Sequence, residues 1–164
     1  MKLEDLSIPN SCKYGIGASA SNWHVDWPSY LRITDISDDG TVSFPLRATI
    51  DPNEYPDWRD YLLKKNDIVF ARTGNSTGRN FFAKQDPNCV FAGFLIKFSI
   101  NPNKVLPQYV GYYCQSSDYK HQVQSFFEGS TRPTMNAELY KRLEIPLVSA
   151  AEQRHIVDAM QSRS

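Results

Sequence analysis

The sequence is poor in cysteine and has no long apolar run, and each shortage excludes a class of protein. The three cysteines, Cys12, Cys89 and Cys114, lie far apart and form no C-x-x-C pair, which argues against a disulfide framework or a zinc site and favours reduced thiols. No run of about 18 apolar residues occurs, so no segment is expected to span a membrane. The N-terminal sequence MKLEDLSIPN lacks the apolar core of a signal peptide. We therefore expect a cytoplasmic chain with a single domain.

Catalytic signatures are also missing. His24, His121 and His155 stand alone, without the i, i+4 spacing of zinc-binding histidines. Gly74 and Gly78 lack the spacing and the lysine of a P-loop, and neither a nucleophile elbow nor a dinucleotide fingerprint occurs. The Asp-Pro and Asn-Pro sites lack the second proline and the aromatic residue of an amino-methyltransferase motif. We therefore expect a chain that is not an enzyme and that binds neither a cofactor nor a metal.

The net charge is zero, which is a poor fit to a typical DNA-binding domain, but the charges are unevenly distributed. Residues 35–58 carry six acids and one base, whereas residues 59–104 carry eight bases and three acids. One face of the folded chain can therefore be basic although the whole molecule is neutral. Ordinary solvated surface explains both stretches equally well, so the charge pattern alone leaves the two interpretations open.

Alternating apolar residues and turn signals predict strands in the first two thirds of the chain. Residues 1–12 are a lead-in segment, and residues 13–30 are predicted as loop. The predicted strands are residues 31–36, 41–46 and 67–72, a returning strand that begins at 81–83, and a central strand at 89–100. The first two form a hairpin around a turn at residues 38–40.

The last third of the chain is predicted to be helical. Pro107 suits the first turn of a helix. Ser117 or Asp118 can cap a second helix, and Asn136 can cap a short third one. Ser149 begins a capping-box pattern and so a final helix. The predicted fold class is therefore α+β, with a mixed, mostly antiparallel sheet followed by helices.

Three loops combine a cation with hydroxyl groups and small residues, at residues 13–22, 72–79 and 130–134. Arginine binds phosphate oxygens and can read guanine, asparagine can read adenine, and glycine lets a backbone approach closely. The alternative for each single loop is an ordinary turn whose hydroxyls bond their own backbone. The candidate DNA-binding residues are Lys13, Tyr14, Ser19, Arg32, Arg72, Thr73, Asn75, Ser76, Thr77, Arg79, Thr131 and Arg132. We expect the cations of the three loops to share one basic surface, namely Lys13, Arg72, Arg79 and Arg132.

Six segments, in fixed order, resemble the specificity subunits of type I restriction–modification systems. Residues 66–74, NDIVFARTG, resemble the G-D-I-hydrophobic-F-A-R-T-G segment of that family. The other five similar segments are residues 14–21, 31–36, 90–96, 129–133 and 145–157. The chain departs from the family pattern at Asn66, where glycine is usual, and at Val148 and Ser149, where a proline pair is usual.

The resemblance implies a target-recognition domain at residues 1–148 and the start of a C-terminal spacer or dimerisation helix at residues 149–164. Ile156, Val157 and Met160 would form an apolar stripe on this helix, only partly covered by the chain itself. As one recognition domain with the start of one helix, the chain corresponds to a fragment, a half-length subunit or one half of a split pair.

The resemblance also implies a function and partners. The domain would bind double-stranded DNA, read one half of a bipartite target, and direct adenine methylation by modification (methyltransferase) subunits and cleavage by a restriction subunit. Partners through the C-terminal helix would be a second recognition domain or a second copy of the chain. The alternative is a non-catalytic protein–protein interaction domain on the same scaffold with little affinity for DNA.

Overall fold

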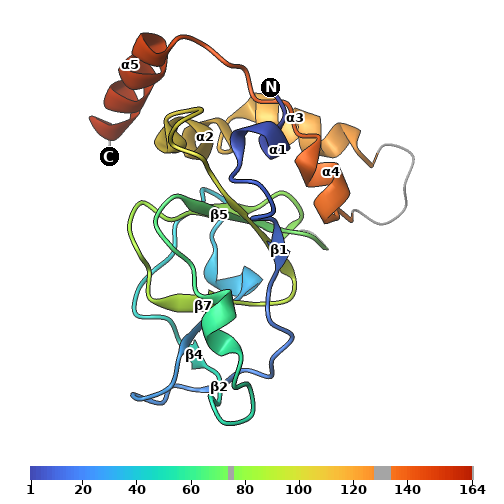
Figure 1. Cartoon of the computed structure of the whole chain (residues 1–164), viewed down its shortest axis with the longest axis vertical. Coiled ribbons are helices and arrows are strands. Elements are labelled where there is room, and N and C mark those ends of the chain that lie inside the picture. The colour runs from blue at the N-terminus through green and yellow to red at the C-terminus, as the bar shows by residue number, and fades with distance from the viewer. Residues whose placement is uncertain (74–75, 128–133, 164) are drawn as a thin grey trace.

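A computed structural model describes residues 1–73, 76–127 and 134–163. Figure 1 shows three layers, with helices on one side of a central sheet and a second sheet on the other side. The first sheet consists of β1 (Lys13–Tyr14), β8 (Leu95–Ser99), β5 (Asp67–Ala71) and β6 (Asn80–Phe82), in that spatial order and all antiparallel. The second sheet consists of β2 (Ser21–Asn22), β4 (Ala48–Thr49), β3 (Ser29–Leu31) and β7 (Cys89–Phe91), with β3 and β7 parallel.

The helical layer completes the α+β fold, which confirms the predicted class. The α-helices are α1 (Leu3–Leu6), α2 (Pro107–Tyr113), α3 (Ser117–Ser125), α4 (Ala137–Lys141) and α5 (Ala150–Gln161). Two 3-10 turns, η1 (Ile33–Asp35) and η2 (Trp58–Tyr61), lie between the strands in sequence. The prediction of one sheet is corrected to two, because the second sheet is built from strands of two or three residues that have no detectable period.

β5 lies at the centre of the molecule, and all five of its residues are buried. Side chains alternate along a strand, so Ile68 and Phe70 pack with the helices while Val69 and Ala71 pack toward β7 and β3. Two hydrophobic clusters therefore meet on the two faces of one strand. This is why residues 68–71 of β5, within the strand predicted at residues 67–72, are all apolar.

Two predicted strands are wrong because local hydrogen bonds compete with pairing. The strand expected at residues 31–36 ends at Leu31, and η1 follows, because the Asp35 carboxylate accepts a hydrogen bond from the Arg32 N–H at 2.8 Å. The strand expected at residues 41–46 is reduced to one bridge, between Ile36 and Val42. The turn between them does form.

The central strand expected at residues 89–100 is two strands in different sheets. A turn closed by the Leu95 N–H donating to the Ala92 carbonyl at 2.9 Å separates β7 from β8. An apolar stretch that crosses between two buried layers has no polar residue to mark its turn. Hydropathy therefore predicted one element where there are two.

Helix boundaries agree more closely with the prediction. Pro107 is the first residue of α2, Asn136 caps α4 by accepting from the Leu139 N–H, and Ser149 caps α5. The cap of α3 is Ser116 and not Ser117 or Asp118, because Ser116 has the extended conformation that a cap requires. α1, within the expected lead-in segment, was not predicted.

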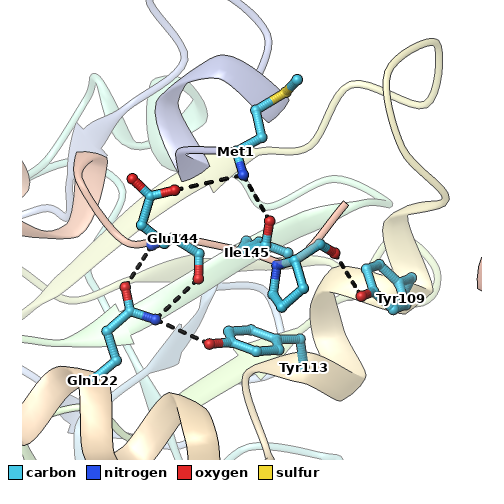
Figure 2. Close-up of polar contacts among 7 residues, drawn as sticks. Met1, Tyr109, Tyr113, Gln122, Glu144 and Ile145 are labelled. Carbon is cyan, nitrogen blue, oxygen red and sulfur yellow. Dashed lines mark hydrogen bonds and ion pairs between the residues drawn. The ribbon is translucent and has the colours of Figure 1, made fainter. Parts of the chain in front are cut away.

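The segment that leads to α5 is fastened to the rest of the helical layer (Figure 2). The Met1 amine donates to the Ile145 carbonyl at 2.8 Å and pairs with the Glu144 carboxylate at 3.5 Å. The Gln122 side chain, from α3, accepts from the Glu144 N–H and donates to the Glu144 carbonyl. These contacts hold the extended backbone from which α5 departs.

α5 packs against α2 and lies away from both sheets (Figure 1). Val157 is fully buried in this contact, and the buried Gln153 amide accepts from the Leu106 N–H at 2.8 Å. Ile156 and Met160 are only partly buried. The apolar stripe is thus partly covered by the chain itself, as expected, although Val157 is covered completely.

Two buried tyrosines hold the turn that follows β5. The Tyr140 hydroxyl donates to the Ala71 carbonyl at 2.5 Å and accepts from the Gly78 N–H at 3.2 Å. The Tyr119 hydroxyl donates to the Gly78 carbonyl at 2.5 Å. Burial raises the pKa of both tyrosine hydroxyls, so both remain protonated donors at neutral pH. Gly78 has a φ of +92°, which glycine adopts without strain.

The variant Tyr140→Phe should test how much the hydrogen bonds of the Tyr140 hydroxyl stabilise the fold. The ring that stacks on Phe70 at 4.6 Å stays, but the Ala71 carbonyl and the Gly78 N–H each lose one hydrogen bond and keep the one between them at 3.2 Å. We expect the free energy of unfolding to fall by about 0.5–1.5 kcal/mol, as measured by urea denaturation. Tyr112→Phe is the matched control, because the Tyr112 hydroxyl is buried and has no hydrogen-bond partner among the described residues. An equal loss of free energy of unfolding in the two variants would contradict a stabilising role for the Tyr140 hydroxyl.

Candidate nucleic-acid interface

The described ends of the second and third candidate loops lie side by side. Thr73 forms an antiparallel bridge with Thr134, and the Met135 N–H donates to the Arg72 carbonyl at 2.8 Å. Met135 is fully buried in the helix-side core. The backbone that follows β5 is therefore held against the backbone that leads into α4, although the two are far apart in sequence.

The first loop joins them through Tyr14. Tyr14 pairs with Ile96, which in turn pairs with Phe70, so its side chain is on the helix side of the sheet. Its hydroxyl accepts from the Ala137 N–H at 2.9 Å, at the start of α4. The Arg72 guanidinium lies 4.8 Å from the centre of its ring, within the range of a cation–π interaction. One residue thus links β1, the turn after β5 and α4.

Phe94 lies beside Arg72 at the same end of the sheet. Its carbonyl accepts from the Arg72 N–H at 3.2 Å, which extends the β5–β8 register one residue beyond the Ala71–Leu95 pair. The Phe94 side chain is 62% exposed. Its exposure was not predicted, because an apolar residue within an apolar stretch is expected in the core. We name Tyr14, Arg72, Thr73, Phe94 and Thr134 the sheet-end surface.

The candidate arginines differ in their partners. Arg79 donates to the Asp38 carboxylate at 2.5 Å, and Arg32 pairs with Asp35 at 3.6 Å. Within residues 1–73, 76–127 and 134–163, Arg72 has no acidic partner, and its buried Nε has no hydrogen-bond acceptor. A guanidinium held by an aromatic ring keeps its charge and its donors available for a phosphate or a base.

Lys13 is not part of this group, and the expectation that one surface holds the cations of all three loops is wrong for it. Successive residues of a strand point to opposite faces, so Lys13 points away from the side of Tyr14. Its ammonium donates to the Asp60 carbonyl at 2.9 Å and lies 4.2 Å from the centre of the Tyr61 ring. The sheet thus separates Lys13 from Arg72.

Arg79 lines a groove of about 410 Å³ between the second loop and α3. Ser76 and Thr77 contribute to the same lining, and Lys120 contributes a second cation from the α3 side. Lys120 was not predicted, because a lysine on a helix surface carries no signal of a binding site. Asp38 also lines the groove and offsets part of the charge of Arg79.

The remaining candidates are divided between other places. The Ser19 N–H donates to the Tyr55 hydroxyl at 2.9 Å, and Tyr55 packs against the cluster of the second sheet. Asn75, Thr131 and Arg132 lie outside the described residues.

The described part of the chain offers no arrangement for metal chemistry. Within it, no group of three His, Cys, Asp or Glu side chains is placed to hold a metal ion. Burial raises the pKa of the Cys89 thiol to about 12, so this thiol stays protonated and unreactive at neutral pH. No described helix has both the length and the apolar character needed to cross a bilayer.

An arginine, threonines and aromatic rings at one end of a rigid sheet are typical of a recognition domain, in which residues on loops contact the ligand. The chain belongs to the family described as the type I restriction modification DNA specificity domain, whose model matches residues 30–163. It is therefore a non-catalytic domain with a target-recognition role, which confirms the prediction that it is not an enzyme.

Solved structures share the fold. A chain from a structure of the assembly and conformational transition of a type I R-M system is 15% identical, with a TM-score of 0.67. The type I restriction–modification S subunit from M. genitalium is 17% identical (TM-score 0.61), and the HsdS subunit from Thermoanaerobacter tengcongensis is 15% identical (TM-score 0.62). Each match covers 99% of this chain but only 42%, 37% and 36% of the other chain, respectively. No curated protein sequence matches significantly.

Variants of Tyr14 should separate its two contacts. Tyr14→Phe keeps the ring beside Arg72 but leaves the Ala137 N–H without its acceptor, so we expect a loss of about 0.5–1.5 kcal/mol in the free energy of unfolding. Tyr14→Leu also removes the cation–π contact and should lose a further ~0.5–1 kcal/mol. Urea denaturation measures both. A Tyr14→Phe variant as stable as the wild type would show that the hydroxyl does not join β1 to α4.

Proposed function

We propose that this chain binds double-stranded DNA and reads one half of a bipartite target, and that it thereby directs adenine methylation and cleavage by modification and restriction subunits. The observation that carries the proposal is the sheet-end surface. There Arg72, held by Tyr14 and without an acidic partner among the described residues, lies where the second and third loops meet. Family membership supports the same ligand, since the family is that of DNA specificity domains.

Two kinds of contact follow from the geometry. Arg72 and Thr73 would approach the base edges, because they directly follow the rigid strand β5. Arg79, Ser76 and Lys120 would follow the phosphate backbone along the groove beside α3. The other candidate DNA-binding residues included in this proposal are Lys13, Ser19, Arg32, Asn75, Thr77, Thr131 and Arg132.

A neutral net charge is compatible with this function. Affinity for DNA depends on the cations that reach phosphates, each of which releases counterions, and not on the total charge. The exposed Asp38 carboxylate stays beside Arg79 in the free chain. DNA would therefore compete with Asp38 for this guanidinium, which would lower nonspecific affinity.

The proposal includes a division of the chain. Residues 1–148 form the recognition domain, and residues 149–164 begin a spacer or dimerisation helix. The departure of α5 from the body and the partial burial of Ile156 and Met160 support a further partner for this helix. That partner would be a second recognition domain, a second copy of the chain or a modification subunit.

DNA binding by the purified chain tests the proposed function directly. A duplex selected from a random-sequence pool by the chain at low salt serves as the probe, and fluorescence anisotropy gives its affinity across a salt series. We expect binding that weakens steeply with salt. An absence of binding at low salt would favour the protein–protein interaction domain instead. Methylome sequencing of cells that carry the chain and its modification partner would identify the target.

Arg72→Ala should weaken binding to the selected duplex by about 1–3 kcal/mol if Arg72 reads a base, or reduce the salt slope by about one if it binds a phosphate. Arg72→Lys separates the cases, because lysine restores the charge but not the bidentate fork. The matched control is Arg59→Ala, since Arg59 also lies over an aromatic ring, that of Trp58 at 4.4 Å, but in η2. Equal effects of Arg72→Ala and Arg59→Ala would contradict the assignment.

Truncation after Val148 tests the division of the chain. α5 contributes one fully buried apolar side chain to the core, that of Val157, so residues 1–148 should still unfold cooperatively, with a lower free energy of unfolding than the full chain. Urea denaturation and near-ultraviolet circular dichroism measure this. Loss of cooperative unfolding would show that α5 is an integral part of the domain.

A further inference from the structure

The aromatic ring of Phe94, at the sheet-end surface, is exposed and does not pack into the core. Phe94 is 62% exposed, in a turn closed by the Leu95 N–H donating to the Ala92 carbonyl at 2.9 Å. Its own carbonyl accepts from the Arg72 N–H at 3.2 Å. The backbone under the ring is therefore fixed by hydrogen bonds on both sides. Single exposed apolar side chains are common on protein surfaces, so the position of Phe94 beside Arg72, on a fixed backbone, is what points to a binding contact.

Glycines bring the first loop against this turn. A Cβ atom on Gly93 would lie 3.6 Å from the Gly17 Cα, and one on Gly15 would lie only 1.9 Å from the Ala92 carbonyl oxygen. The two backbones are thus in direct contact, with no side chain between them. Phe94 consequently lies between the first loop and the start of the second loop.

We propose that Phe94 is a base-contacting residue, whose ring packs on the apolar surface of the bases next to the contacts of Arg72. This inference rests on the proposed function. A phenyl ring gains nothing from phosphates, which are charged and hydrated. The apolar surfaces that DNA offers are the faces of its bases, reached when a ring inserts at a base step, and the methyl group of thymine. Phe94 thus adds sequence preference without adding charge.

Phe94→Ala gives a signature that a charged contact cannot give. We expect its affinity for the duplex selected by the wild-type chain to fall roughly ten- to a hundredfold. The slope of log affinity against log salt should stay at the wild-type value, because no counterion is released by a neutral ring. An unchanged urea midpoint, expected for so exposed a residue, confirms that the variant is folded.

Phe44→Ala is the matched control. Phe44 is also an exposed phenylalanine, at 49%, but it lies near the β6 edge of the sheet. There the centre of its ring is 6.2 Å from the centre of the Phe81 ring. We expect this variant to bind DNA like the wild type. An equal loss of affinity in both variants would overturn the proposal, because it would indicate a general effect of exposed rings.

Two probes identify the base surface. A rise in 2-aminopurine fluorescence at one position, absent with Phe94→Ala, supports insertion of the ring at a base step. A loss of affinity on replacing one thymine by uracil, seen with the wild type but not with Phe94→Ala, supports contact with a methyl group. Either result supports the inference.

The two proposals fail differently. If the wild-type chain shows no salt-dependent binding to DNA, the proposed function fails and the role of Phe94 fails with it. If the wild type binds and Arg72→Ala is impaired, but Phe94→Ala binds with wild-type affinity and sequence preference, only the role of Phe94 is overturned. A reduced salt slope in Phe94→Ala would also overturn it, since that result belongs to a charged contact.

Discussion

The sheet-end surface depends on one buried hydroxyl group, that of Tyr140. It bonds the last carbonyl of β5, at Ala71, and the N–H of Gly78, where the chain turns back toward β6. Both backbone groups are buried and also bond each other at 3.2 Å, so the hydroxyl adds a second hydrogen bond to each. The two ends of the second loop are therefore fixed to α4, and the same helix begins with the N–H that bonds Tyr14. Recognition loops that start from such a frame lose less conformational entropy when they bind.

The partners of the arginines reconcile a neutral chain with a proposed DNA interface. Arg32 and Arg79 each form an ion pair with a carboxylate, which lowers the positive electrostatic potential around them. Arg72 instead lies over the π face of Tyr14. An aromatic ring orients a guanidinium without neutralising it. Of the candidate arginines in the described part of the chain, Arg72 is thus the one whose charge no carboxylate offsets. Such an arrangement favours local recognition over nonspecific adhesion to phosphates.

The arrangement in two sheets explains why the sheet-end surface contains both polar and apolar groups. The turn between β7 and β8 carries the chain from one sheet to the other, and this change of layer brings Phe94 to the surface beside Arg72. At the opposite end of the helical layer, α5 lies on α2 through Val157 and Gln153. The chain spans about two fifths of the length of the solved structures that it matches. Further contacts of α5 in a longer assembly are compatible with this position.

The sequence by itself determined the α+β class, the strand β5, the helix start at Pro107 and the caps at Asn136 and Ser149, because each depends on residues adjacent in the chain. It also indicated the family, through ordered segments around residues 66–74. Only the tertiary structure decided that Lys13 and Arg72 lie on opposite faces of the sheet, that the stretch 89–100 crosses between two sheets, and that Phe94 is exposed. The physical reason is that burial and proximity arise from packing between distant segments, whereas capping and strand alternation are local. A composition pattern can therefore find a loop rich in arginine, but only the packed sheet determines which arginine keeps its charge free.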